Sequence, residues 1–122
     1  MATSDRAVSI APYFKVHTGQ LAAFRELCQR FVAKTEPEPG CLYYGFSFEG
    51  DEVHCREAYA DAEGLLAHLG SVGELIAEAM ELADMTRVEI HGPAEELAKL
   101  RAPLHDLAPQ YFTLEFGFRR GG

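Results

Sequence analysis

The hydrophobic pattern divides the chain into short apolar runs and longer amphipathic segments. Runs rich in aromatic and β-branched residues predict strands at 8–14, 41–48, 53–59, 86–91 and 111–118. Apolar residues at spacings of three and four predict one helix over residues 21–32 and a second over residues 62–80, capped by Asp61. Gly70 and Gly73 are expected to bend or break the second helix, because glycine lowers helix stability.

The predicted order is β-α-β-β-α-β, followed by a short helix that starts at Pro93 and by the last strand. Two βα units around a central hairpin form a split βαβ arrangement, which is a ferredoxin-like α+β fold. Right-handed crossovers place both long helices on one face of a four-stranded sheet. Residues 1–122 are therefore expected to form one domain, with a core at 8–92 and an added arm at 93–118.

The other face of this sheet is expected to be bare and aromatic. Alternation groups Leu42, Tyr44, Phe46 and Phe48 on one side of their strand, and a monomer rarely exposes such a surface. A second copy packed sheet against sheet would cover it, with residues 111–118 reaching across. We therefore expect a homodimer with an interface above about 1,200 Å².

Net charge and cysteine content narrow the set of partners and cofactors. The formal charge is −8, whereas a nucleic-acid-binding protein needs a basic face. No apolar run approaches the ~20 residues of a membrane span, so neither nucleic acid nor a membrane is an expected partner. Cys28, Cys41 and Cys55 are odd in number and lack CxxC spacing. This favours reduced thiols in a cytoplasmic protein without a zinc site or a disulfide framework.

Three motifs resemble a known family. They are the segments EPGCLYY at 38–44, REAYAD at 56–61 and LLAHL at 65–69. In this order they resemble the antibiotic biosynthesis monooxygenase (ABM) family, over residues 8–92. The resemblance implies a ferredoxin-like subunit that pairs into a dimeric α/β barrel. The family includes cofactor-free oxygenases of phenols, quinol monooxygenases, haem-degrading enzymes and an isomerase, so the fold transfers better than the function.

Departures from the family pattern argue against haem. The haem-degrading branch relies on an Asn in the first strand and on a Trp, and this sequence has neither. Gly73 also stands where many relatives carry a second histidine in the helix. We therefore expect no haem, metal or other cofactor.

The residues that match the family suggest an acid–base site. His68 matches a family position in the second helix, and it is the expected base because histidine titrates near neutral pH. Glu57 lies mid-strand among apolar neighbours, where a carboxylate either pairs with an Arg or Tyr or acquires a raised pKa. Tyr59 is expected to point the same way as Glu57 and to donate to an oxyanion. Because the second helix covers the opposite face of the sheet, His68 reaches a barrel cavity only if the helix overhangs its mouth.

A second group of polar residues lies on the strand over 86–91. Arg87, Glu89 and His91 share one side of it, which favours salt bridges at a dimer seam and makes His91 an alternative base. The complete set of candidates is His68, Glu57, Tyr59 and His91 for catalysis and Tyr44, Phe46 and Arg87 for substrate binding.

These expectations describe a cofactor-independent monooxygenase that acts with O2 on a small aromatic molecule such as a phenol or quinol. Two alternatives stay open. The first is a non-enzymatic small-ligand-binding or stress-related barrel, and the second is an isomerase or lyase that uses the same cavity without oxygen.

Overall fold

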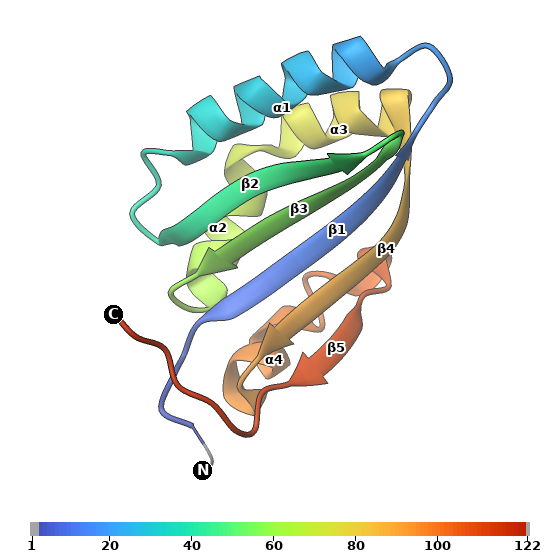
Figure 1. The fold of residues 1–122 in the computed structure, drawn as a ribbon. Helices are drawn as coiled ribbons and strands as arrows, with labels where there is room; N and C mark the ends of the chain where they lie inside the picture. The colour runs from blue at the N-terminus through green and yellow to red at the C-terminus, as the bar shows by residue number, and fades with distance from the viewer. Residues whose placement is uncertain (1–2, 122) are drawn as a thin grey trace.

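In the computed structural model, which describes residues 3–121, helices cover one face of a five-stranded sheet (Figure 1). The strands are β1 (Val8–Val16), β2 (Cys41–Glu49), β3 (Glu52–Tyr59), β4 (Ala83–Gly92) and β5 (Gln110–Thr113), in the spatial order β2-β3-β1-β4-β5. Neighbouring strands are antiparallel except β5, which runs parallel to β4. The ferredoxin-like order β-α-β-β-α-β is confirmed, with β5 added beside β4.

The helices follow the predicted pattern, with one division. They are α1 (Leu21–Thr35), α2 (Ala62–Ser71), α3 (Gly73–Leu82) and α4 (Ala94–Leu100), followed by a 3-10 turn at His105–Leu107. The expected break in the second helix falls at Val72, whose backbone is not helical (φ −101°, ψ 12°) and whose side chain is buried. None of the helices within residues 3–121 has the length and apolar character needed to cross a membrane.

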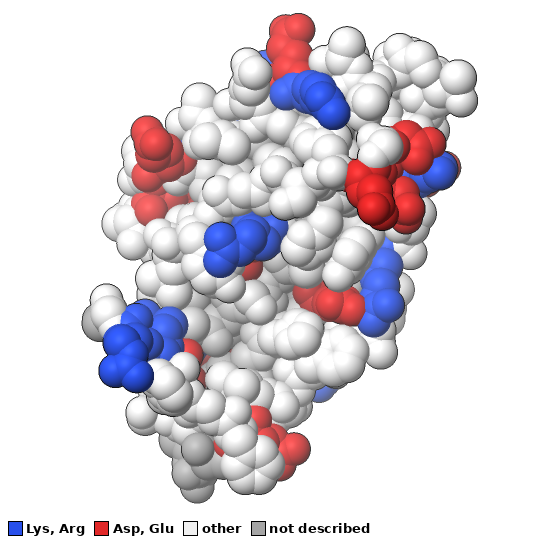
Figure 2. Space-filling model, in the orientation of Figure 1, with Lys and Arg blue, Asp and Glu red and all other residues white. Residues whose placement is uncertain are grey.

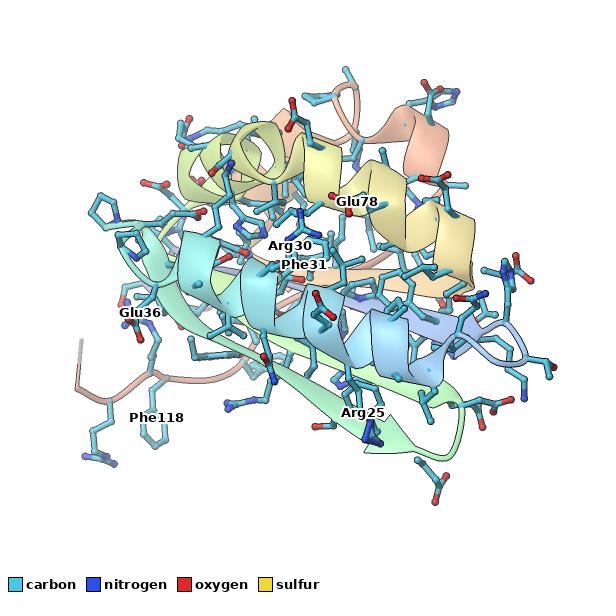
Figure 3. All side chains as sticks on the ribbon, turned by 90° about the horizontal axis from the view of Figure 1, so that it is seen from above. Arg25, Arg30, Phe31, Glu36, Glu78 and Phe118 are labelled. Carbon is cyan, nitrogen blue, oxygen red and sulfur yellow. The ribbon has the colours of Figure 1, made fainter. Side chains whose placement is uncertain are left out.

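The core lies between the sheet and the helices. The apolar stripe of α1 (Phe24, Leu27, Cys28 and Phe31) is buried there. In Figure 3, α1 and α3 lie side by side, and Arg30 and Glu78 join them by two hydrogen bonds of 2.8 and 2.9 Å.

The expectation that Leu42, Tyr44, Phe46 and Phe48 share the bare face is wrong for Tyr44, Phe46 and Phe48. Their rings pack on the helix side, against the core of α1 and α3. The reason lies across the hairpin: Phe46 pairs with Cys55 and Phe48 with Val53, and both partners face the helices. Directly paired residues share a face of the sheet, so β3 decides the orientation of β2.

The open face of the sheet combines aromatic rings with charged groups. The Arg56 guanidinium lies 4.1 Å from the Tyr43 ring centre, and the rings of Tyr13 and His54 are 4.7 Å apart. Figure 2 shows small groups of Lys or Arg beside Asp or Glu, separated by uncharged surface. In the view of Figure 1 the strands lie in front of α2 and α4.

The last strand is shorter than predicted, since β5 ends at Thr113. β4 ends at Gly92, whose carbonyl accepts the Leu114 amide at 2.7 Å, so β5 has no strand to follow beyond that point. The rest of the chain runs beside the N-terminal segment, where Arg119 binds Asp5 at 3.0 Å (Figure 1). Phe116 and Phe118 in this segment are 84% and 78% exposed, and Phe118 projects away from the body of the protein (Figure 3).

Candidate acid–base site

A cavity of about 70 Å³ lies between the sheet and helices α1, α2 and α3. Most of its wall is apolar, and the cavity extends from Val72 past Ile76 and Ala79 of α3. Its polar wall is formed by Glu57, His68, Tyr44 and Cys55. The cavity is therefore an apolar space with one chemically active region.

The position of this cavity corrects the expected relation between Glu57 and His68. Val53, Cys55, Glu57 and Tyr59 alternate along β3 and are all buried toward the helices. Glu57 and Tyr59 therefore lie on the same side of the sheet as α2, and His68 reaches them without any overhang of the helix. The cavity belongs to the interior of one chain rather than to the open face of the sheet.

Glu57, Tyr59 and His68 are in direct contact. The Tyr59 hydroxyl donates to Glu57 Oε1 at 2.5 Å, and His68 Nε2 lies 3.5 Å from the same oxygen. The His68 ring also packs against two tyrosines, with ring centres 5.2 Å away for Tyr44 and 5.1 Å away for Tyr59. Both His68 and Glu57 are buried, at 2% and 5% exposure.

The start of α2 places His68. Asp61 caps this helix by accepting the Gly64 amide at 2.9 Å, as its sequence position predicts. Two turns later His68 faces inward, and its Nδ1 lies 3.0 and 3.1 Å from the two carboxylate oxygens of Glu38. Glu38 was not among the candidates. It lies in the turn after α1, 30 positions before His68, so spacing along the chain carries no signal of the contact.

Burial changes the protonation of this group. Desolvation raises the pKa of Glu57 to about 7, although hydrogen bonds from Tyr59 and Cys55 act in the opposite direction. Desolvation also lowers the pKa of His68, against the attraction of the Glu38 carboxylate. Near neutral pH, His68 is thus a neutral base beside a carboxyl group that is close to half protonated.

The other polar groups of the cavity stay protonated. Burial raises the pKa values of Tyr44, Tyr59 and Cys55. The Tyr44 hydroxyl is therefore a hydrogen-bond donor, and the Cys55 thiol is not a thiolate nucleophile. Residues 3–121 contain no group of three or more His, Cys, Asp or Glu side chains that could hold a metal ion.

Two candidates do not join this group. Val88 and Ile90 face the core, so Arg87, Glu89 and His91 lie on the open side of β4, away from the cavity. The His91 ring stacks on Phe112 with 4.7 Å between ring centres, and Arg87 pairs with Glu89. Of the predicted substrate-binding residues, Tyr44 and Phe46 line the cavity and Arg87 does not.

Comparison with known proteins places this chain among others of the same fold. MupZ from Pseudomonas fluorescens is 52% identical, with a TM-score of 0.91 over 95% of this chain and 96% of that one. Rv0793 from Mycobacterium tuberculosis is 26% identical, with a TM-score of 0.64 over 71% of this chain and 94% of that one. A conserved protein from Methanosarcina mazei Go1 shares the fold at 22% identity and a TM-score of 0.66, over 71% and 92% of the two chains.

No curated protein sequence matches the chain. The family model for antibiotic biosynthesis monooxygenases matches residues 7–81, which include β1 to α2 and the polar group in the cavity. The chain belongs to the antibiotic biosynthesis monooxygenase family.

Proposed function

We propose that this protein is an enzyme that uses His68 and Glu57 to move protons on a small, uncharged molecule in the cavity. The observation that carries the proposal is the contact between a neutral imidazole and a carboxyl group of pKa about 7 in an apolar cavity. Such a pair supplies a base and an acid at the same pH. Membership of the family supports a monooxygenase-type role.

The reaction we propose is the oxygenation of a phenol or quinol by O2 without a cofactor. His68 Nε2 removes the hydroxyl proton, and the resulting anion supplies electrons to O2. One oxygen atom enters the ring and the other leaves as water, which takes one proton from the His68 imidazolium and one from the Glu57 carboxyl group. The proton that the ring carbon loses then returns to Glu57. Oxidation of a phenol to a quinone releases four electrons, which is the number that O2 accepts in this step, so no other reductant is required.

The apolar wall and the charge of the cavity support such a substrate, and its volume limits the substrate to a small molecule. The cavity of about 70 Å³ is about half the size of an apolar cavity of ~150 Å³ that holds benzene, so a single aromatic ring enters only if the side chains around it move apart. Among the described residues that line the cavity, none is a Lys or Arg. One carboxyl group, that of Glu57, lies at its polar wall, so an uncharged substrate fits better than a carboxylate or phosphate.

Oxygen consumption tests this proposal. Single-ring phenols and quinols are supplied to the protein in an oxygen electrode, with His68→Ala and Glu57→Gln measured beside it. We expect turnover that requires O2 and falls by about 10²–10⁴-fold in each variant, which is the usual contribution of a positioned acid or base. Equal rates in all three proteins would refute the assignment of these residues.

A second candidate function is an isomerase or lyase that does not use oxygen. One observation favours it: His68 Nε2 lies next to an oxygen of the Glu57 carboxyl group. The base can therefore take a proton from one atom of a substrate while the acid gives a proton to another atom. Turnover that continues under nitrogen and incorporates deuterium from D2O would select this function. Binding without turnover in either atmosphere would instead indicate a ligand-binding protein.

We also propose that the protein is a homodimer joined through the open face of the sheet. The support is the aromatic character of that face and the exposure of Phe116 and Phe118 beside it.

Cys28, Cys41 and Cys55 are all free thiols, which fits a reducing cytoplasm.

A further inference from the structure

Glu38 is a carboxylate that the proposed chemistry leaves unused, although it makes the closest polar contact to the base. Both of its oxygens lie within 3.1 Å of His68 Nδ1. Its side chain is 18% exposed, whereas that of His68 is 2% exposed. Glu38 thus closes the outer side of the site, opposite the cavity.

The backbone holds Glu38 in this place. Its amide donates to the Thr35 carbonyl at 2.9 Å, and its own carbonyl accepts the Cys41 amide at 3.2 Å. Two residues later Gly40 passes so close to α2 that an added Cβ would lie 3.2 Å from the Gly64 Cα. The turn that carries Glu38 therefore packs directly on the helix that carries His68.

This contact determines which ring nitrogen carries the proton. A neutral imidazole has one N–H, and a carboxylate 3.0 Å from Nδ1 accepts a hydrogen bond only if the N–H is there. The lone pair of Nε2 then faces Glu57 and the cavity. The opposite tautomer would place a lone pair against the Glu38 oxygens and would leave no base facing the substrate.

We propose that Glu38 is a positioning residue that fixes the tautomer and orientation of His68, so that Nε2 is the base. This inference rests on the proposed function, because it matters only if His68 accepts a substrate proton. When Nε2 takes that proton, the Glu38 carboxylate stabilises the imidazolium that forms. The same proton later leaves from Nε2, and the Nδ1–H bond to Glu38 stays intact throughout.

Three variants of the full chain test the proposal. Glu38→Ala removes the acceptor, and Glu38→Gln keeps the shape but offers an amide that can accept from or donate to Nδ1. Glu36→Gln is the matched control, since it removes the same charge at an exposed residue in the same turn (Figure 3). Long-range ¹H–¹⁵N spectra of the histidine rings report the tautomer without any substrate, and the spectrum of His68→Asn assigns the signal.

We expect the Nδ1–H tautomer of His68 in the unmodified protein and in Glu36→Gln, and a mixture of tautomers in both Glu38 variants. Once a substrate is identified, we expect kcat to be about 10- to 100-fold lower in the Glu38 variants. We expect KM to change little, because Glu38 does not line the cavity.

An Nε2–H tautomer in the unmodified protein, or Glu38 variants that match Glu36→Gln in spectrum and in kcat, would overturn the inference. If Glu38→Ala fails to fold, Glu38→Gln alone decides the question. If His68→Ala loses turnover while Glu38→Gln keeps it in full, the proposed role of Glu38 is rejected and the proposed function stands. Full turnover in His68→Ala would remove the proposed function itself.

Discussion

Burial of a single carboxyl group, that of Glu57, links the site to the stability of the whole chain. Its pKa is about 7 in the folded protein against an ordinary value of 4.5. Between these two pH values the folded state keeps a proton that the unfolded chain has released. Stability therefore falls as pH rises through this window. At about 1.4 kcal/mol per pKa unit, the loss is about 3 kcal/mol once the pH exceeds 7.

Glu57→Gln is expected to remove this loss, because the amide stays neutral at every pH. Relative to the unmodified protein, the variant should gain nothing near pH 4.5 and about 3 kcal/mol above pH 7. Urea unfolding at several pH values measures the difference, with the exposed Glu81→Gln as control. A difference that does not change with pH would show that the pKa of Glu57 is the same in the folded and unfolded chains, and would contradict the raised value.

Residue types predicted part of the site. A carboxylate among apolar strand residues identified Glu57, and the resemblance to the family identified Tyr59 and His68. The structure brings these three candidates into contact. Glu38 could not be found this way. Its place depends on the close approach of Gly40 to Gly64, a contact between two elements that no local pattern records.

Among the secondary-structure elements, two glycines differ in whether the surrounding packing leaves room for a side chain. Gly70 is exposed within α2, and a Cβ added there meets nothing within 4 Å. At Gly92, where β4 ends, an added Cβ would lie 2.8 Å from Val8 Cγ1 in the core. Gly92 is thus required by space, whereas Gly70 only lowers the stability of its helix.

We expect Gly70→Ala to stabilise the protein by roughly 0.5–1 kcal/mol, and Gly92→Ala to destabilise it by about 1–3 kcal/mol through overpacking. Thermal unfolding of both variants in one buffer makes the comparison. Opposite signs are the essential result. A stabilised Gly92→Ala protein would mean that β1 moves away from β4 without cost.

How well a helix or strand is predicted depends on whether the residues that determine it lie close together in the sequence. The helices and the hairpin were predicted well, because capping residues, periodicity and turn residues act within a few positions. The face of β2 was predicted wrongly, since alternation defines two sides and only the pairing with β3 decides which is inside. The predicted strand over 111–118 stopped at Thr113, because its length is limited by the end of β4.

For the molecule as a whole, the C-terminal segment is unusual because it exposes large apolar side chains, and no contact among the described residues of a single copy accounts for this. Phe116 and Phe118 are the most exposed of the large apolar side chains within residues 3–121. The segment that carries them is tied to the N-terminal segment by the hydrogen bond from Arg119 to Asp5, and both rings stay exposed to solvent. A second copy that buries them would satisfy both observations.

Removal of residues 114–122 is therefore expected to weaken the proposed homodimer by at least about tenfold in Kd, which corresponds to about 1.4 kcal/mol. The double variant Phe116→Ser, Phe118→Ser should have the same effect without shortening the chain. Met80→Ser serves as control, because Met80 is also exposed, at 38%, but lies on a helix rather than on this segment. Sedimentation at micromolar concentrations measures all four proteins. Dimers of unchanged affinity in the truncated and serine variants would show that the segment is not part of the interface. A monomeric unmodified protein would exclude the homodimer and leave the site complete within one chain.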